Sequence, residues 1–195
     1  MDKIWVIQKK CVGCRTCEIA CAVTRDSVVK TLVGGMEEEH RPQSRVTVRG
    51  SGRTAYPMQC RHCADAPCVK ACRVGAMTQK EDGEVVLNPD KCVGCGQCVK
   101  ACPNGAVSLL NGFRAAVKCD ACIHRGSSAC VESCPTGALF RGTKEEFVKY
   151  LIGVCPEAEG KSICSVCGRI REDADEISLC PVCGAEKEKF LVIER

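Results

Sequence analysis

Cysteine spacing constrains this chain more than any other feature of its sequence. The thiols of the long N-terminal part fall into four quartets, and three quartets end in C-x3-C-x2-G-A followed by an apolar residue (CVKACRVGAM, CVKACPNGAV and CVESCPTGAL). Such self-similarity predicts a structural unit that is repeated along the chain. In order, the first to fourth quartets are Cys11, Cys14, Cys17 and Cys21; Cys60, Cys63, Cys68 and Cys72; Cys92, Cys95, Cys98 and Cys102; and Cys119, Cys122, Cys130 and Cys134.

Each repeat predicts the same local structure. We expect a metal-binding loop, a short helical turn that carries the fourth cysteine, a glycine with positive φ, and then a short strand. Proline follows Cys102 and Cys134, whereas Ala22 and Arg73 stand at the equivalent positions of the first two quartets. The absence of proline there predicts a looser turn.

The number of cysteines, 21 in 195 residues, indicates a chain held together by disulfides or by metal. Disulfides need an oxidising compartment. The first residues, MDKIWVIQKKCVGC, show no apolar signal segment, cleavage site or twin arginine. No apolar run reaches the roughly 18 residues of a membrane span. We therefore expect a cytoplasmic protein without a direct membrane span, whose thiolates bind metal.

The ligand spacing favours iron and sulfide. Thiolates select zinc, copper(I) or iron-sulfur clusters, and structural zinc sites usually draw their ligands from two separated pairs. The third quartet instead reads C-x2-C-x2-C-x3-C-P, the run of two-cluster ferredoxins in which the last cysteine binds the other cluster. The sixteen quartet cysteines thus predict four [4Fe-4S] clusters in two ferredoxin-like pairs, although spacing alone leaves the pairing open.

The charge distribution agrees with bound clusters. Residues 157–195 carry nine acids and six bases, and residues 1–156 carry fifteen acids and twenty-two bases, so the long segment is +7 and the tail is −3. Four oxidised clusters with their thiolates would add about −8, which brings the long segment close to neutrality. The bases are scattered, without a basic run interleaved with aromatic residues, so nucleic acid is not an expected partner.

Residues 1 to about 142 resemble the four-cluster electron-transfer subunits of molybdopterin oxidoreductases, formate dehydrogenases and hydrogenases. The motifs IWV, MQCRHCADAPCVKAC and KCVGCGQCVKACP are most similar to the iron-sulfur subunit that accompanies anaerobic carbon monoxide dehydrogenase. This resemblance implies that the first quartet pairs with the fourth and the second with the third. The implied ligand sets are Cys11, Cys14 and Cys17 with Cys134; Cys119, Cys122 and Cys130 with Cys21; Cys60, Cys63 and Cys68 with Cys102; and Cys92, Cys95 and Cys98 with Cys72.

The same resemblance implies an electron-transfer subunit and not an enzyme with its own substrate site. The sequence has no phosphate-binding loop, dinucleotide fingerprint or nucleophile elbow. Electrons would pass from a catalytic partner, with carbon monoxide dehydrogenase favoured, to a flavin NAD(P) oxidoreductase or a hydrogenase. The alternatives are a formate dehydrogenase, hydrogenase or molybdopterin oxidoreductase as partner, or a free-standing polyferredoxin with a structural zinc tail.

A second kind of cysteine motif lies near the C-terminus, in SICSVCGRIREDADEISLCPVCGAEKEKF. Two knuckles of this kind can close a tetrahedral four-sulfur site. The segment resembles a rubredoxin-like domain, especially the short form at the end of rubrerythrins, which binds one iron, although Arg169 and Ile170 stand where aromatic residues are usual. Zinc is the alternative metal, because both ions accept four thiolates. The four cysteines are Cys164, Cys167, Cys180 and Cys183.

The predicted fold is small and α+β. Two ferredoxin-like, bacterial dicluster modules form a four-cluster body, and a rubredoxin-like or zinc-ribbon-like β domain follows. The body spans residues 1–153 with an insertion at about 25–58, a linker spans 154–162, and the metal domain spans 163–195. In the insertion we expect a polar loop and then a β-hairpin at SRVTVRGSGRTAYP, either a surface ribbon or a partner-docking element.

Single residues outside the quartets carry three further predictions. Thr143 and Glu146 form a predicted capping box at the head of a helix that ends at Gly153 and seals the body. Cys155 belongs to no quartet and is interpreted as a linker thiol. His62 is expected to donate a hydrogen bond to a cluster sulfur rather than to bind iron.

Overall fold

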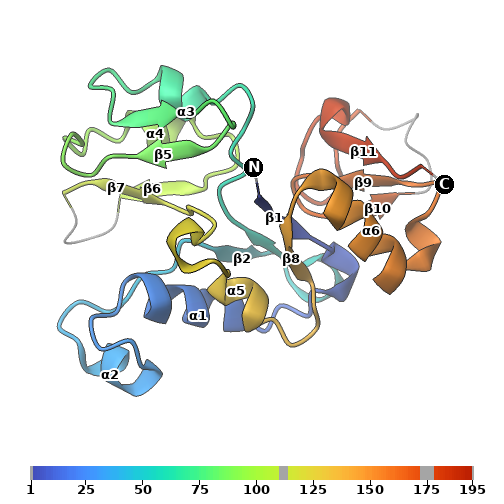
Figure 1. Ribbon diagram of the computed structural model, residues 1–195, viewed down its shortest axis with the longest axis horizontal. Coiled ribbons are helices and arrows are strands. Elements are labelled where there is room, and N and C mark those ends of the chain that lie inside the picture. Colours follow the sequence, from blue (N-terminus) through green and yellow to red (C-terminus); the bar gives the residue numbers. More distant parts are fainter. Residues whose placement is uncertain (1, 110–113, 172–177, 195) are drawn as a thin grey trace.

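The computed structural model describes residues 2–109, 114–171 and 178–194. Short helices and short strands alternate along the chain, which is the small mixed fold that the sequence predicts. They gather into three groups around a central N-terminal strand (Figure 1). No helix of the described residues has the length and hydropathy needed to cross a bilayer.

The first group joins the beginning of the body to its end. Strand β1 (Lys3–Val6) pairs antiparallel with β8 (Leu139–Gly142), and helix α1 (Thr16–Arg25) packs beside α5 (Ala129–Glu132). This pairing brings the first and fourth quartets together. The buried apolar residues of this core include Ile4, Val6, Val46, Val48 and Leu139.

The second group carries the second and third quartets. Its elements are α3 (Pro67–Lys70), β4 (Met77–Gln79), β5 (Val85–Leu87), α4 (Gln97–Ala101), β6 (Val107–Leu109) and β7 (Ala116–Lys118). The strands form two antiparallel hairpins, β4 with β5 and β6 with β7, and the two helices contact each other. Met77, Val85, Val107 and Ala116 are buried between them in a separate core.

The repeated glycine ends three of the units as predicted. Gly75, Gly105 and Gly137 have φ of 62°, 54° and 61°, and each amide donates to the carbonyl of the fourth cysteine of its quartet. This left-handed turn, which favours glycine, leads directly into β4, β6 or β8. The prediction that a helical turn carries the fourth cysteine is wrong in these three quartets. The helices there are about one turn long and end before that cysteine.

The insertion contains a helix, α2 (Leu32–Glu37), where the sequence predicts a loop. The predicted hairpin follows, as β2 (Thr47–Arg49) paired antiparallel with β3 (Tyr56–Met58). The side chains of Val48, Tyr56 and Met58 are at most 5% exposed, and they share a core with the C-terminal domain. The hairpin is therefore an internal docking element of this chain and not a surface ribbon.

Helix α6 (Lys144–Val154) has the predicted capping box. The Thr143 amide donates to the Glu146 carboxylate over 2.8 Å, and the Glu146 amide donates to the Thr143 hydroxyl over 3.3 Å. Phe147 and Leu151 are fully buried on one side of the helix. The helix ends one residue beyond the predicted Gly153.

The C-terminal domain is a three-stranded sheet in which β9 (Ser162–Cys164) lies between β10 (Ile170–Arg171) and β11 (Phe190–Val192). Ile163 and Ile193 from this domain share a core with α6. The predicted linker is part of that core, because Cys155 and Ala158 are buried in it. The remaining elements are short 3-10 helices at Gln8–Lys10, Gly52–Thr54, Ile123–Arg125, Pro156–Ala158 and Lys187–Lys189.

Candidate metal centres

Three cavities of nearly equal size are lined by cysteines, and each takes three thiols from one quartet and one from another. Counted with the space that is open to solvent, their empty volumes are about 320, 330 and 320 Å³. Four thiols around one cavity are the donor set of a [4Fe-4S] cluster, so the residues fit that cofactor. The lining cysteines are Cys119, Cys122, Cys130 and Cys21; Cys92, Cys95, Cys98 and Cys72; and Cys60, Cys63, Cys68 and Cys102.

The remaining quartet cysteines also lie together. Cys134, from the fourth quartet, interacts electrostatically with Cys11 and Cys17 of the first, and Cys14 interacts with Cys11. These interactions require short distances, because charges separated by more than about 10 Å are largely screened. The exchange of the fourth cysteine between quartets therefore recurs here.

Burial raises the pKa of the thiols that face the cavities. Desolvation raises the pKa of Cys68 to about 11 and that of Cys17 and Cys119 to about 12, and it also raises the pKa of Cys130. The thiolate is the metal ligand, and a bound cation deprotonates a coordinating thiol. These thiols are therefore suited to metal binding and unsuited to act as free nucleophiles.

Backbone amides point at the sulfur of the fourth cysteine in each quartet. The amides of Ala106 and Ala138 donate to the Sγ atoms of Cys102 and Cys134 over 3.3 Å. In the second quartet the amide of Met77 donates to Cys72, one residue later in the turn, also over 3.3 Å. The looser turn predicted after Cys72 is thus a shift of the donating amide by one residue. Amides that donate to a ligating thiolate stabilise it.

The first quartet differs because its helix continues. Helix α1 runs four residues past Cys21 to Arg25, so no glycine turn follows the cysteine. The amide of Arg45, from the insertion, donates to the Cys21 sulfur over 3.3 Å instead. Arg25 in turn forms an ion pair with Asp120, in the loop between Cys119 and the third ligand of the fourth quartet, at 2.5 Å.

Exposure and proximity distinguish inner thiols from outer ones. Cys119 of the first group interacts electrostatically with Cys60 of the second, so two cavities lie near the junction between the groups. Among the sixteen quartet cysteines, only Cys14 and Cys95 are exposed. Each exposed thiol belongs to a C-V-G-C loop whose valine, Val12 or Val93, is also exposed.

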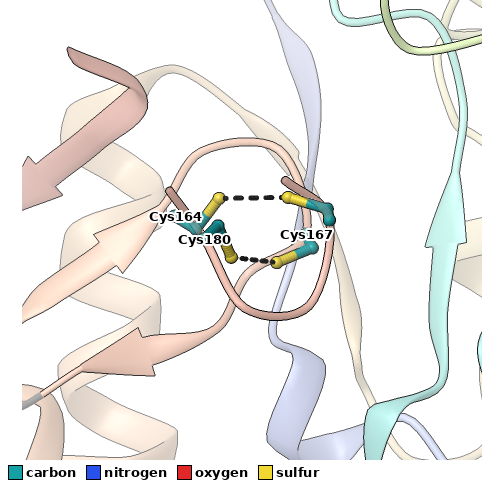
Figure 2. A group of neighbouring side chains, drawn as sticks. Cys164, Cys167 and Cys180 are labelled. Atoms are coloured by element: carbon teal, nitrogen blue, oxygen red, sulfur yellow. Dashed lines mark hydrogen bonds between the residues drawn. The ribbon is translucent and has the colours of Figure 1, made fainter. Parts of the chain in front are cut away.

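The C-terminal domain brings its four cysteines into one tight cluster. The sulfur atoms all lie within 4.8 Å of one another, with 3.7 Å between Cys164 and Cys183 and 3.6 Å between Cys167 and Cys180. The labelled cysteines in Figure 2 point toward a common centre. A tetrahedron with metal-sulfur bonds of about 2.3 Å has edges of about 3.8 Å, so this cluster fits one tetrahedral ion.

Two knuckle turns position these thiols. The amides of Gly168 and Gly184 donate to the carbonyls of Cys164 and Cys180, each over 2.8 Å, and both glycines have positive φ, 77° and 72°. The same turn therefore occurs on both sides of the site. Glycine is favoured at these positions because the left-handed conformation strains other residues.

The four thiols also share their protons. The hydrogen bond with Cys167 lowers the pKa of Cys164 to about 7, and hydrogen bonds with Cys164 and Cys167 lower that of Cys180. The donors of these bonds hold their protons, so the pKa values of Cys167 and Cys183 are raised. In the absence of metal, the site above about pH 7 therefore holds two thiolates, Cys164 and Cys180, and two thiols.

His62 and Cys155 are both buried by protein atoms. The His62 Nδ1 atom accepts a hydrogen bond from the Val85 amide over 3.1 Å, which places the ring proton on Nε2. Burial lowers the pKa of His62 to about 3, so the ring is neutral. Nε2 has no hydrogen-bond partner among the described residues. Cys155 is 4% exposed and packs in an apolar core. A buried free cysteine usually acts as a small apolar side chain. Cys155 is therefore not a thiol of an open linker.

Two segments of the chain match models of known domains. Residues 53–144 match the 4Fe-4S dicluster domain. Residues 163–191 match the rubredoxin-like domain of rubrerythrin. The first match contains the second, third and fourth quartets, and the second contains the tight four-cysteine cluster.

Three relatives show the range of proteins that contain a similar segment. UacF of Escherichia coli is 45% identical over 132 residues, which are 67% of this chain and 19% of UacF. An iron-sulfur protein of Rhodospirillum rubrum is 37% identical over 148 residues, covering 66% of this chain and 75% of that protein. One polypeptide of the anaerobic dimethyl sulfoxide reductase of E. coli is 34% identical over 153 residues, covering 74% of this chain and 75% of that polypeptide.

Proposed function

Because the chain belongs to the family of iron-sulfur electron-transfer proteins built on the 4Fe-4S dicluster domain, we propose that it relays electrons through four [4Fe-4S] clusters within an oxidoreductase complex. The observation that carries the proposal is the exchange of cysteines between quartets. Three cavities are each lined by three thiols of one quartet and one of another, and Cys134 of the fourth quartet interacts electrostatically with Cys11 and Cys17 of the first. Such exchange places clusters in adjacent pairs, the arrangement that a relay requires.

The proposed ligand sets follow these groups. They are Cys11, Cys14, Cys17 and Cys134; Cys119, Cys122, Cys130 and Cys21; Cys60, Cys63, Cys68 and Cys102; and Cys92, Cys95, Cys98 and Cys72. The electrostatic interaction between Cys119 and Cys60 indicates that the two pairs are neighbours, so we take the second and third sets in this order as the inner ones. The path then ends at the two exposed thiols, Cys14 and Cys95.

The chain's own residues set the conditions for transfer. When bound, the clusters supply one-electron storage. The thiols would hold them, the amides of Ala106, Ala138 and Met77 donate to ligating sulfurs, and burial keeps water away from Cys119, Cys122, Cys130 and Cys21. Both properties tune the potential of a cluster. Four protein thiols per cluster leave no iron open to a substrate, which supports a role in transfer rather than catalysis.

The two exposed ends are suited to contact partners. At each end an exposed valine of the C-V-G-C loop accompanies the exposed cysteine, Val12 at 64% and Val93 at 55%. Apolar side chains around an exposed thiol ligand allow a partner to exclude water from the path. One end would receive electrons from a catalytic subunit and the other would pass them on.

The catalytic partner we favour is a molybdopterin-type oxidoreductase, because a dimethyl sulfoxide reductase polypeptide is among the relatives that align over most of their length. Carbon monoxide dehydrogenase is the second candidate, and it rests on the likeness of the motifs IWV and MQCRHCADAPCVKAC. A flavin NAD(P) oxidoreductase is the proposed acceptor. For the C-terminal site we propose iron, as a fifth centre, with structural zinc as the alternative.

Anaerobic purification of the tagged chain tests this function. Four cubanes predict about sixteen irons and sixteen sulfides per chain, and an iron-loaded C-terminal site adds about one iron. Mass spectrometry of co-purifying proteins identifies the partner: a molybdopterin subunit would support the favoured complex, and a carbon monoxide dehydrogenase would support the second candidate. A preparation with zinc and no labile sulfide would contradict the proposed relay.

A further inference from the structure

The C-terminal metal site lies against the middle of the chain's body. Cys164, Cys167 and Cys180 share a core with Ile4 of β1 and Tyr56 of β3, and Tyr56 interacts electrostatically with the thiol of Cys183. The domain is therefore packed on the body through its metal-binding knuckles.

Arg61 connects this site to the second quartet. It directly follows Cys60, and its guanidinium donates to three backbone carbonyls. These are the carbonyl of Ile4 over 3.1 Å, that of Pro57 over 3.5 Å, and that of Val166, between the first two ligands of the C-terminal site. One side chain thus ties the first knuckle to β1, to β3 and to the second-quartet loop.

The charge of Arg61 acts on two kinds of centre. The guanidinium interacts electrostatically with Cys167, Cys164 and Cys183 of the C-terminal site, and with Cys119 of the fourth quartet. Its Nε atom is buried without a hydrogen-bond partner among the described residues. A buried positive charge beside four thiolates stabilises the more negative, reduced state of a metal bound there.

A cleft of about 480 Å³ also joins the two sites. It is lined by Cys183 of the C-terminal site, Cys63 of the second quartet, and Arg61. A second hollow brings Cys11 of the first quartet near Arg169, but none of the four C-terminal ligands lines it. The second quartet is therefore better placed beside the C-terminal site than the first quartet is.

From this placement we infer that Arg61 couples the C-terminal metal site to the second-quartet cluster, so that the site is a side branch from the middle of the electron path. The inference rests on the proposed relay. The branch point is the inner cluster of Cys60, Cys63, Cys68 and Cys102. Arg61 acts as a positioning residue, since it touches neither metal.

The test is the midpoint potential of the C-terminal centre in the full chain, loaded with iron and titrated anaerobically. Arg61→Gln removes the charge and is expected to shift that potential downward. Arg61→Lys keeps the charge but cannot reproduce the planar set of hydrogen bonds, and it is expected to keep most of the wild-type potential. Arg73→Gln is the matched control, because Arg73 is exposed and follows Cys72, and it should leave the potential unchanged.

The two Arg61 variants separate charge from structure. A residue that only holds the domain in place would give equal shifts in Arg61→Gln and Arg61→Lys, because both lose the three-carbonyl contact. Equal shifts, or no shift in Arg61→Gln, would overturn the coupling.

A second pair of variants identifies the branch point. Cys68→Ala removes a ligand of the second-quartet cluster and Cys98→Ala removes the equivalent ligand of the third. Loss of a negatively charged neighbour raises a potential, so Cys68→Ala should raise the potential of the C-terminal iron and Cys98→Ala should leave it unchanged. The reverse pattern would place the branch elsewhere. Iron and sulfide counts of the wild-type chain report separately on the proposed relay.

Discussion

Gly168 lies directly against Val6. A Cβ atom on Gly168 would lie 1.9 Å from the carbonyl oxygen of Val6 and 3.0 Å from the amide nitrogen of Gln8, and Gly168 also has φ of 77°. Both obstacles are backbone atoms, so a side chain there cannot be accommodated by a rotamer change. We predict that Gly168→Ala separates the C-terminal domain from β1 at a cost of about 2–5 kcal/mol, measured as faster hydrogen exchange in β9, β10 and β11.

Gly184 provides the matched control for that substitution. It occupies the same knuckle position with φ of 72°, but a Cβ there meets no atom within 4 Å. Gly184→Ala should therefore cost only the strain of the left-handed conformation, about 1–2 kcal/mol. Equal effects of the two substitutions would show that the contact with Val6 does not hold the domain.

Replacement of Cys102 tests the exchange of ligands between quartets. Cys102 lines the cavity of Cys60, Cys63 and Cys68, so Cys102→Ala should remove the second-quartet cluster and leave the third-quartet cluster in place. Cys98→Ala should do the opposite. Iron analysis together with EPR spectra of the reduced chain distinguishes the two losses. If Cys102→Ala removed the cluster of Cys92 instead, the pairing would be wrong.

The ion pair between Arg25 and Asp120 should stabilise the inner cluster of the first group. Both side chains are about one fifth exposed and their charged atoms are 2.5 Å apart, a geometry in which a charged hydrogen bond contributes about 1.5–3 kcal/mol. We expect Asp120→Asn to speed the loss of iron from that cluster under an anaerobic chelator, because the loop between Cys119 and Cys122 is less firmly held.

An exposed ion pair in another quartet loop is the control. Asp65 and Lys70 are also 2.5 Å apart, but their side chains are 78% and 70% exposed. Exposed pairs contribute about 0–1 kcal/mol. Asp65→Asn should therefore leave the rate of iron loss almost unchanged, and an equal acceleration in both variants would contradict a specific role for Asp120.

The local structure follows from the sequence because its signals are local. The glycine turns after Cys72, Cys102 and Cys134, the hairpin around the G-S-G segment and the capping box at Thr143 all depend on residues within a few positions of one another. The same holds for the C-terminal knuckles, whose spacing alone places four thiols within reach of one ion.

The packing between distant segments could not be predicted in this way. Cys155 is buried because α6 and β9 meet around it, and the hairpin is buried because the C-terminal domain covers it. Arg61 lies inside a cysteine motif, where sequence alone gives it no partner, and its contacts are with residues 4 and 166. Helix α2 was missed because Gly34 and Gly35 lower its intrinsic helix propensity, while the Thr31 side chain caps it.

Metal binding at the C-terminal site should release protons in a number that depends on pH. Near pH 8 the metal-free site holds thiolates at Cys164, whose pKa is about 7, and at Cys180, and it holds thiols at Cys167 and Cys183. Because the metal binds four thiolates, two protons leave, and affinity should rise about 100-fold per pH unit. Below pH 7, Cys164 is protonated as well, three protons leave, and the rise should steepen to about 1,000-fold per pH unit.

The slope of metal affinity against pH is measured by competition between the full chain and a chelator for the C-terminal metal. The result is corrected for the chelator's own protonation. The cubane absorbance is followed in parallel to confirm that those clusters stay intact. Cys155→Ser is the control, because Cys155 is a buried thiol outside the site and its loss should leave the slope unchanged. Release of four protons near pH 8 would mean that no thiolate is present before the metal binds. That result would contradict the proton sharing among Cys164, Cys167 and Cys180.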